Sequence, residues 1–336
     1  YTSNKNKLTR TFNTLSGTYT ITKGLKLKEV LSYDFTQNAS IAWWGPQSND
    51  GRTANGVFQK YMINTSKFNS QTQLTYDRSF DRVHNLSFLL GYETEAYKNE
   101  NVYGTGSNYA AMDDPKPEIQ NAAITKSSSS ISEYRMLSYL GRADYNYDSK
   151  YYVSASYRRD GSSRLAKANR WGDFWSLGGA WIVSKEKFFQ NLNAKWVDNL
   201  KFKVSVGQQG NDGIPDFNYI DRYSLVRGEK AMLPSFSDIG NPDITWETTT
   251  NFNLGLEFAL FQSRLNGEFN FYTKKTTDML FWLGVPESVG VRGYYGNLGD
   301  IRNAGVEFTI GGDIIRTKNI IWNVSANISH NRAKAL

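Results

Sequence analysis

The chain has 336 residues, a formal net charge of +7 and no cysteine. Its longest apolar runs, such as Met279–Leu283, are far shorter than the roughly 20 residues of a membrane-spanning helix, which excludes a helical membrane protein. The lack of cysteine excludes disulfides, thiolate catalysis and thiolate metal sites, and it fits an extracytoplasmic compartment.

The mean hydropathy of -0.55 is that of a soluble protein. In a membrane β-barrel, however, only alternate residues face lipid, so the polar half of each strand offsets the apolar half. Aromatic residues make up 15% of the chain, which suits the two aromatic girdles of a barrel as well as a soluble core. The Lys and Arg residues are scattered and no helix-based reading motif is present, so no nucleic-acid partner is expected. Contact with anionic lipopolysaccharide explains the positive charge equally well.

Apolar and polar residues alternate along most of the chain, which predicts strands with one apolar and one polar face. In one such segment the apolar set is Phe252, Leu254, Leu256, Phe258 and Leu260. About twelve strands are predicted, at residues 8–22, 24–42, 58–80, 85–98, 131–148, 150–160, 172–184, 199–209, 244–260, 263–281, 297–314 and 319–332. Many exceed the roughly 5–6 residues usual in soluble proteins and supply the roughly 9–11 residues of a tilted membrane strand.

The predicted connections alternate in length. Short turns are expected at Lys23–Gly24, Asp81–Asn85, Asp148–Ser149, Gln262–Ser263 and Arg316–Asn319. Long polar loops are expected at residues 43–57, 98–130, 161–171, 210–243 and 282–296, and a longer turn at 185–198 is expected to hold a helical turn. Short periplasmic turns alternating with long extracellular loops are typical of an outer-membrane barrel, so all the short turns should lie at one end.

Four stretches resemble the SusC/RagA-like TonB-dependent transporters. They are Arg159–Arg164 with Arg170–Gly172 and Trp181–Glu186; Gly207–Asn211; Gly240–Asp243 running through Trp246–Thr249 to Gly255–Phe258; and Asn297–Asp300 with Arg302–Glu307. Together they cover roughly residues 130–330. Trp175 departs from the family pattern, which more often has proline there. The motif residues are predicted to be structural, since Asn241-Pro242-Asp243, for example, has the composition of a turn.

The resemblance implies a barrel of about 22 strands filled by an N-terminal plug, a segment that binds TonB, and a SusD-like surface lipoprotein that closes over the barrel. Residues 1–336 are therefore expected to be part of a single all-β domain, an antiparallel transmembrane β-barrel wall. The plug, the TonB-binding segment and the remaining strands are expected to lie outside this sequence. The expected location is the outer membrane of a Gram-negative, Bacteroidetes-type bacterium, in contact with lipid and lipopolysaccharide.

The sequence offers little for chemistry. His84 lies in a predicted short turn and His330 near the end of the last strand, so a shared catalytic or metal site is not expected. The Asn211-Asp212-Gly213 stretch lacks the spaced oxygen ligands of a calcium loop. No enzyme activity, cofactor or metal is therefore predicted.

Aromatic residues near the predicted extracellular strand ends are the candidate substrate contacts. The candidates are Trp43, Trp44, Trp282, Arg292, Tyr294 and Tyr295. Sugar rings stack on aromatic planes, and a guanidinium such as that of Arg292 binds hydroxyls or a peptide carboxylate. The alternative interpretation places these aromatics in the outer girdle of the barrel.

The predicted function is TonB-dependent import of oligosaccharides or peptides, which the lumen and the extracellular loops would bind without chemical change. Two alternatives remain: a secretion-associated or structural outer-membrane barrel, and a passive porin. A plug domain upstream in the gene would distinguish an importer from a porin. A neighbouring surface-lipoprotein gene would favour nutrient import over secretion.

Overall fold

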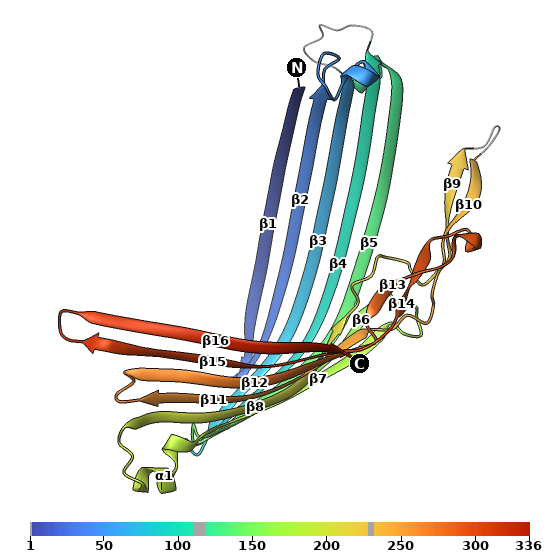
Figure 1. Cartoon of the computed structure of the whole chain (residues 1–336). Helices are drawn as coiled ribbons and strands as arrows, with labels where there is room; N and C mark the ends of the chain where they lie inside the picture. Colours follow the sequence, from blue (N-terminus) through green and yellow to red (C-terminus); the bar gives the residue numbers. More distant parts are fainter. Residues whose placement is uncertain (1, 110–117, 228–231) are drawn as a thin grey trace. The chain divides into compact units, whose positions relative to one another are not determined.

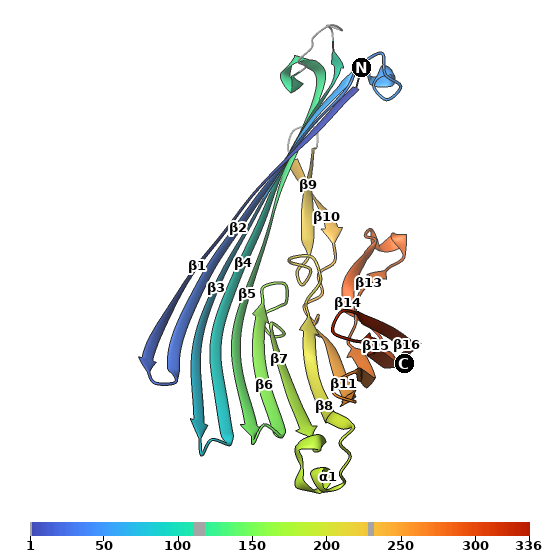
Figure 2. The same ribbon diagram turned by 90° about the vertical axis from the view of Figure 1, so that its left-hand side faces the viewer.

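The computed structural model describes residues 2–109, 118–227 and 232–336. Twelve strands form one sheet in which hydrogen-bonded neighbours follow chain order, as Figures 1 and 2 show for successive ribbons. They are β1 (Thr2–Thr22), β2 (Leu25–Trp44), β3 (Val57–Phe80), β4 (His84–Tyr109), β5 (Ala122–Tyr147), β6 (Tyr151–Ser162), β7 (Trp171–Ile182), β8 (Val197–Asn211), β11 (Glu247–Leu260), β12 (Leu265–Thr277), β15 (Ile301–Arg316) and β16 (Ile321–Ala335). The predicted strand number and the all-β class are confirmed.

The predicted loop at 98–130 was wrong in extent. Strand β4 continues to Tyr109 and β5 begins at Ala122, so much of that range is paired backbone. Residues 98–109 and 122–130 are rich in Asn, Ser, Thr and Lys and lack the apolar alternation by which the other strands were recognised. Backbone pairing does not require an apolar side-chain face, and a strand with water on both sides has no reason to alternate. Residues 110–117 of the predicted loop lie outside the described residues.

Two other predicted loops contain additional strands. The range 210–243 holds a hairpin of β9 (Arg222–Arg227) and β10 (Met232–Asp238), and the range 282–296 overlaps a hairpin of β13 (Leu280–Gly284) and β14 (Gly293–Asn297). Each hairpin is a two-stranded sheet separate from the main one. Three 3-10 turns, η1 (Arg52–Ala54), η2 (Ile119–Asn121) and η4 (Glu287–Val289), complete the long connections.

The helical turn predicted between 185 and 198 is confirmed. It consists of η3 (Val183–Lys185) and α1 (Lys187–Asn191), which connect β7 to β8 (Figure 2). No helix among the residues described is long and apolar enough to cross a lipid bilayer.

By internal contacts the chain divides into two compact units. The first comprises Tyr1–Gly17, Lys28–Thr72 and Glu93–Met136, and the second comprises Thr18–Leu27, Gln73–Tyr92 and Leu137–Leu336. Every short turn of the twelve-stranded sheet belongs to the second unit. The long connections at 45–56 and 110–121 belong to the first, and those at 163–170, 212–246 and 278–300 belong to the second. The predicted alternation of short and long connections is confirmed.

The strand register of the second unit separates an apolar from a polar face. Leu254 on β11 lies between Val204 on β8 and Phe271 on β12, whereas the next residue in the chain, Gly255, lies between Lys203 and Asn270. The apolar face is not covered by the chain, since the exposed fractions of Leu254 and Val204 are 46% and 45%. A large uncovered apolar surface of this kind is expected of a sheet that contacts lipid.

Leu256 and Asn253 provide the test of these two faces. Leu256 pairs with Phe202 and Phe269 on the apolar face, while Asn253 pairs with Ser205 and Tyr272 on the polar face, as their odd separation predicts. We expect Leu256→Arg to lower the free energy of unfolding in lipid vesicles by up to about 2–4 kcal/mol, the cost of arginine on the lipid face near the midplane. Asn253→Arg should change it little. Equal losses measured by urea titration would contradict the face assignment.

The Glu186 carboxylate binds two aromatic side chains next to the helical connection between β7 and β8. The Glu186 Oε1 atom accepts hydrogen bonds from the Tyr151 hydroxyl and, at 3.1 Å, from the Trp181 indole. The Tyr151 and Trp181 rings are nearly parallel, with centroids 6.3 Å apart. Donation by Tyr151, and then by Trp181, holds the pKa of the Glu186 carboxyl below its usual value.

We therefore expect a pH dependence at Glu186. Because its pKa is lowered in the folded state, the stabilisation is present above the unfolded pKa of about 4.3 and is lost as pH falls through the folded pKa. Glu186→Gln should lower the Tm in detergent at neutral pH and converge with the parent protein in acid. Gln190→Ala, which removes a non-titrating side chain from α1 in the same connection, is the control and should show a difference that does not vary with pH. A pH-independent difference for Glu186→Gln would contradict the linkage.

Candidate functional site

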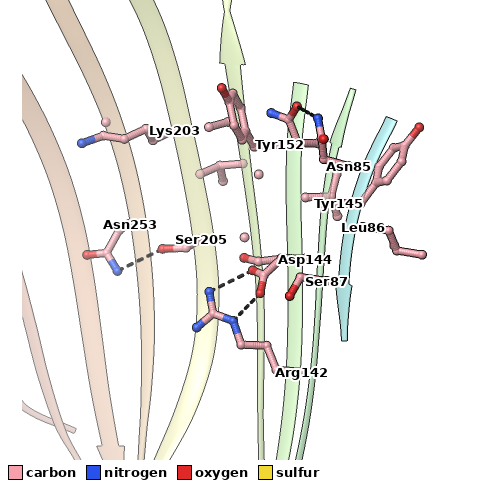
Figure 3. Close-up of a pocket in the computed structure, with 18 of the residues that line it drawn as sticks. Asn85, Leu86, Ser87, Arg142, Asp144, Tyr145, Tyr152, Lys203, Ser205 and Asn253 are labelled. Carbon is pink, nitrogen blue, oxygen red and sulfur yellow. Dashed lines mark hydrogen bonds and ion pairs between the residues drawn. The ribbon is translucent and has the colours of Figure 1, made fainter. Parts of the chain in front are cut away.

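Polar side chains from β3 to β15 line a concave region on the polar face of the second unit, with a volume of about 880 Å³. Figure 3 shows its centre, where Asn85, Arg142, Lys203 and Asn253 come from four different strands. Their side chains alternate with apolar ones along each strand, so the period of two brings them to the same face. The region therefore presents a row of donors and acceptors across neighbouring strands.

The polar groups of this region are bonded mainly to one another. Arg142 makes a bidentate ion pair with Asp144, with Nε and Nη2 at 2.7 and 2.8 Å from the two carboxylate oxygens. The Asn253 amide donates to the Ser205 hydroxyl at 3.5 Å, a long bond in a solvent-exposed pair (Figure 3). Exposed bonds of this length exchange readily with water or with a polar ligand, since each is worth only about 0.5–1.5 kcal/mol net.

An ion network that includes the lining residue Lys203 joins three strands of this region. The Lys203 ammonium on β8 contacts Glu257 on β11 and, at 2.6 Å, Glu268 on β12. Lys201 pairs with Glu257 at 3.2 Å, and the Asn270 amide donates to Glu268 at 2.9 Å. Two ammonium groups thus face two carboxylates and the network is neutral. The arrangement can bind polar, uncharged groups, and it holds no nucleophile paired with a base.

Two of the sequence motifs meet in a buried loop core with Asp212 and Asp216, which follow a third motif. Ser162 is fully buried and its hydroxyl donates to Asp212 at 2.6 Å, while the Arg164 backbone N–H donates to Ser162 at 3.1 Å. The Arg164 guanidinium pairs with Asp216 at 3.2 Å. The Trp246 indole donates to the Arg170 carbonyl at 3.0 Å. This packing accounts for the motifs structurally, in agreement with the role predicted for them.

The Asp212 carboxylate is bonded to other residues of this core. It accepts from Ser162 and lies 3.8 Å from Arg164, so its lone pairs are directed at protein groups. No cluster of His, Asp and Glu that could hold a metal ion occurs within residues 2–109, 118–227 and 232–336.

Four of the six predicted contact residues lie on the β13–β14 hairpin. Trp282 and Tyr295 face each other across it, with ring centroids 5.1 Å apart and an interplanar angle of 70°. Tyr294 opposes Leu283, and the exposed Arg292 directly precedes β14. These residues were predicted in a loop. They lie instead on strands, or directly before one, because Leu280–Gly284 pairs with Gly293–Asn297.

The hairpin is positioned by the loop core. The Asn241 amide, in the Gly-Asn-Pro-Asp motif, donates to the Tyr295 carbonyl at 3.0 Å. The Thr245 N–H donates to the Asn297 side chain at 2.9 Å. Gly293 permits the close approach beneath Trp282, because a Cβ there would lie 2.9 Å from the indole and 2.2 Å from the Leu283 carbonyl oxygen.

Trp43 and Trp44 end β2 and belong to the other unit. The Trp43 ring meets the edge of Tyr109 at 5.2 Å and lies 6.5 Å from Phe58. A Cβ on Gly56 would come within 2.8 Å of the indole, so Trp43 covers the loop backbone. Trp43 therefore has a packing role whether or not it also contacts substrate.

Residues 1–335 match the protein family described as TonB dependent receptor-like, beta-barrel. The chain belongs to this family. The TonB-dependent receptor P3 of Formosa agariphila is 31% identical over 322 residues, which cover 94% of this chain and 32% of that receptor. The TonB-dependent receptor SusC of Bacteroides thetaiotaomicron is 31% identical over 288 residues, 82% of this chain and 28% of SusC.

Among solved structures, the RagAB peptide transporter superposes on this TonB-dependent receptor barrel with a TM-score of 0.92 and 27% identity, covering 99% of this chain and 37% of the matched one. The resemblance to the SusC/RagA-like receptors is thereby confirmed. The chain spans about a third of the length of these relatives.

The loop core of this receptor barrel gives a stability prediction. Ser162→Ala should lower the free energy of unfolding by about 1–3 kcal/mol, because it removes the buried hydrogen bonds that the Ser162 hydroxyl makes with the Asp212 carboxylate and the Arg164 N–H. Thermal unfolding in detergent measures the effect. Ser329→Ala, on the exposed strand β16, is the matched control and should change stability by less than about 0.5 kcal/mol. Equal effects of the two would show that the buried network is not stabilising.

Proposed function

We propose that this protein imports oligosaccharides or peptides across the outer membrane in a TonB-dependent manner and does not change them chemically. The observation that carries the proposal is the superposition on the RagAB peptide transporter along 99% of the chain. The division of the sheet into an uncovered apolar face and a hydrogen-bonding polar face supports it physically.

The polar face suits passage better than tight binding. Its charges are compensated internally, as in the pairs of Arg142 with Asp144 and Lys203 with Glu268. A neutral sugar or peptide would exchange bonds to water for bonds to groups such as Asn253 and Ser205, with a small net gain for each. A solute held by several weak bonds can still leave, which transport requires.

In our proposal, TonB supplies the energy for import, and other parts of the receptor complete the barrel. An N-terminal plug with a TonB-binding segment would block the lumen and open on contact with TonB, and further strands would complete a barrel of about 22. A SusD-like surface lipoprotein would hold substrate over the long loops. Lipid would cover the apolar face and lipopolysaccharide the outer rim, in the outer membrane of a Bacteroidetes-type bacterium.

Within the loops, we place the substrate contact on the β13–β14 hairpin. Trp282 offers a partly exposed indole, and the exposed Arg292, opposite Val285 at the other end of the same hairpin, offers a donor for hydroxyl or carboxylate oxygens. Tyr294 and Tyr295 contribute the neighbouring rings. Trp43 and Trp44 would provide a second contact in the other unit, with Trp44 the more available because Trp43 packs on Tyr109.

Uptake by cells tests the function. A strain lacking this gene should lose uptake of one oligosaccharide or peptide class from a labelled panel, and loss of TonB in the parent strain should abolish the same uptake. Uptake that persists without TonB would indicate a passive porin. Unchanged uptake of the whole panel, with a protein missing from the cell surface, would indicate the secretion alternative.

Binding to the purified full-length protein tests the hairpin. Trp282→Ala and Tyr295→Ala should each weaken the binding of the transported solute by about twofold to tenfold, which corresponds to about 0.5–1.5 kcal/mol per ring contact. Calorimetry provides the measurement. Tyr223→Ala is the control, because Tyr223 is a 62% exposed aromatic on the separate β9–β10 hairpin. Equal effects of all three would argue against a contact at Trp282.

A further inference from the structure

A groove lies on the apolar face of the second unit, next to the turn between β11 and β12. Its volume is about 540 Å³. Its lining includes Phe261 and Arg264 from the turn, Leu265 on β12, Ile310 and Gly312 on β15 and Ala326 on β16. Leu265 pairs with Gly312, and Ile310 pairs with Ala326, so the groove follows two successive rows of side chains away from the turn.

The hollow is built into the backbone. A Cβ on Gly312 would lie 2.8 Å from the Arg264 carbonyl oxygen and 3.3 Å from the Leu265 side chain. Main-chain atoms cannot move aside as a flexible side chain can, so this position excludes the side chain that would fill the space. In the next row, Ala326 on β16 has only a methyl side chain and so leaves the groove open there. The surrounding Leu265, Ile310 and Phe261 form apolar walls.

The turn end of the groove carries the features of a membrane–water interface. Phe261 stacks on Trp196 with centroids 5.9 Å apart, and the Phe261 N–H donates to the Trp196 carbonyl at 2.7 Å. Both rings are more than half exposed. Exposed aromatic rings at strand ends mark the level of lipid headgroups in membrane proteins. The groove therefore runs from the headgroup level into the apolar layer.

The charge at that end is positive on balance, because Arg264, Arg316 and Lys318 outnumber the carboxylates of Asp313 and Asp198, and Asp198 accepts from the Ser263 N–H at 2.9 Å. Asp313 is compensated by Arg316 at 3.5 Å and accepts from the Asn323 amide at 3.0 Å. Arg264 donates to the Asp313 backbone carbonyl at 3.4 Å and forms no ion pair with any residue that the structure describes. Lys318 adds a further cation in the next turn. A guanidinium held by a backbone bond and lacking a carboxylate is complementary to a phosphate.

We propose that this groove binds one acyl chain of an anionic glycerophospholipid and that Arg264 binds the lipid phosphate. The inference rests on the proposed membrane location of the apolar face. The groove would hold a lipid longer than the surrounding annular lipids, because it combines a fitted apolar hollow with a matched charge. It would thereby anchor the β11–β12 and β15–β16 hairpins at the level of the short turns.

The full-length protein, delipidated in detergent and incubated with dioleoyl phosphatidylglycerol, provides the test by native mass spectrometry. We expect one phospholipid to remain bound at activation energies that remove the others. Ala326→Phe, which fills the groove, should reduce its retained fraction by about tenfold. Arg264→Gln should reduce it similarly and should abolish the preference for phosphatidylglycerol over phosphatidylcholine.

Matched variants outside the groove are the controls. Ala304→Phe adds the same ring to the apolar face of the sheet, on β15 but away from the groove. Arg302→Gln removes a cation from the end of β15 that lies opposite the groove. Both variants should retain the lipid as the parent protein does. Heat-modifiable mobility on gels confirms that each variant is folded. Equal retention by Ala326→Phe and Ala304→Phe, or by Arg264→Gln and Arg302→Gln, would overturn the proposal. The assay contains no sugar or peptide, so failure of the proposed import would leave this test intact.

Discussion

A strand that crosses hydrocarbon must pair every backbone N–H and C=O within the protein, because lipid offers no hydrogen-bonding partner. In this chain the ten inner strands of the sheet have a hydrogen-bonded neighbour on each side, and the neighbours follow chain order; β1 and β16 each have one such neighbour among the described residues. The order skips strand numbers only where β9–β10 and β13–β14 are inserted as separate hairpins between β8 and β11 and between β12 and β15. The long connections can therefore carry structure of their own without interrupting the ladder that the membrane demands.

The ladder also determines what side chains can do. With a period of two, each residue faces either the apolar or the polar side, and cross-strand neighbours share that side. The polar face uses this to compensate charge between strands, as Lys203 does with Glu257 and Glu268. On the other face the same regularity leaves residues such as Val204 and Leu254 uncovered. One periodicity thus creates both a hydrogen-bonding face and an uncovered apolar face.

The loops depend on a different kind of interaction. Ser162, Arg164, Asp212 and Asp216 form a part-buried polar network, and fully buried Leu165 and Ile244 give the same region an apolar centre. From this core, Asn241 holds the hairpin that carries Trp282 and Tyr295. A hairpin supported in this way holds its rings in a defined position, as the proposed substrate contact requires. The family motifs contain no catalytic group, and their role in this structure is to hold the loop core and the hairpin in place.

The sequence by itself determined the twelve long strands, their two faces and the alternation of turns and loops, because a two-residue period is a local property of the chain. Its motifs also indicated the receptor family, which the comparisons confirmed. Only the tertiary structure decided the partners across strands, such as Lys203 with Glu268 and Ser162 with Asp212, because alternation specifies a face and leaves the register open.

The structure alone also revealed that β4 and β5 extend through polar sequence and that the aromatics at 282 and 295 pair in a hairpin. In both places hydrogen bonds between neighbouring backbones form the strand, and that pairing requires no alternation of apolar and polar side chains.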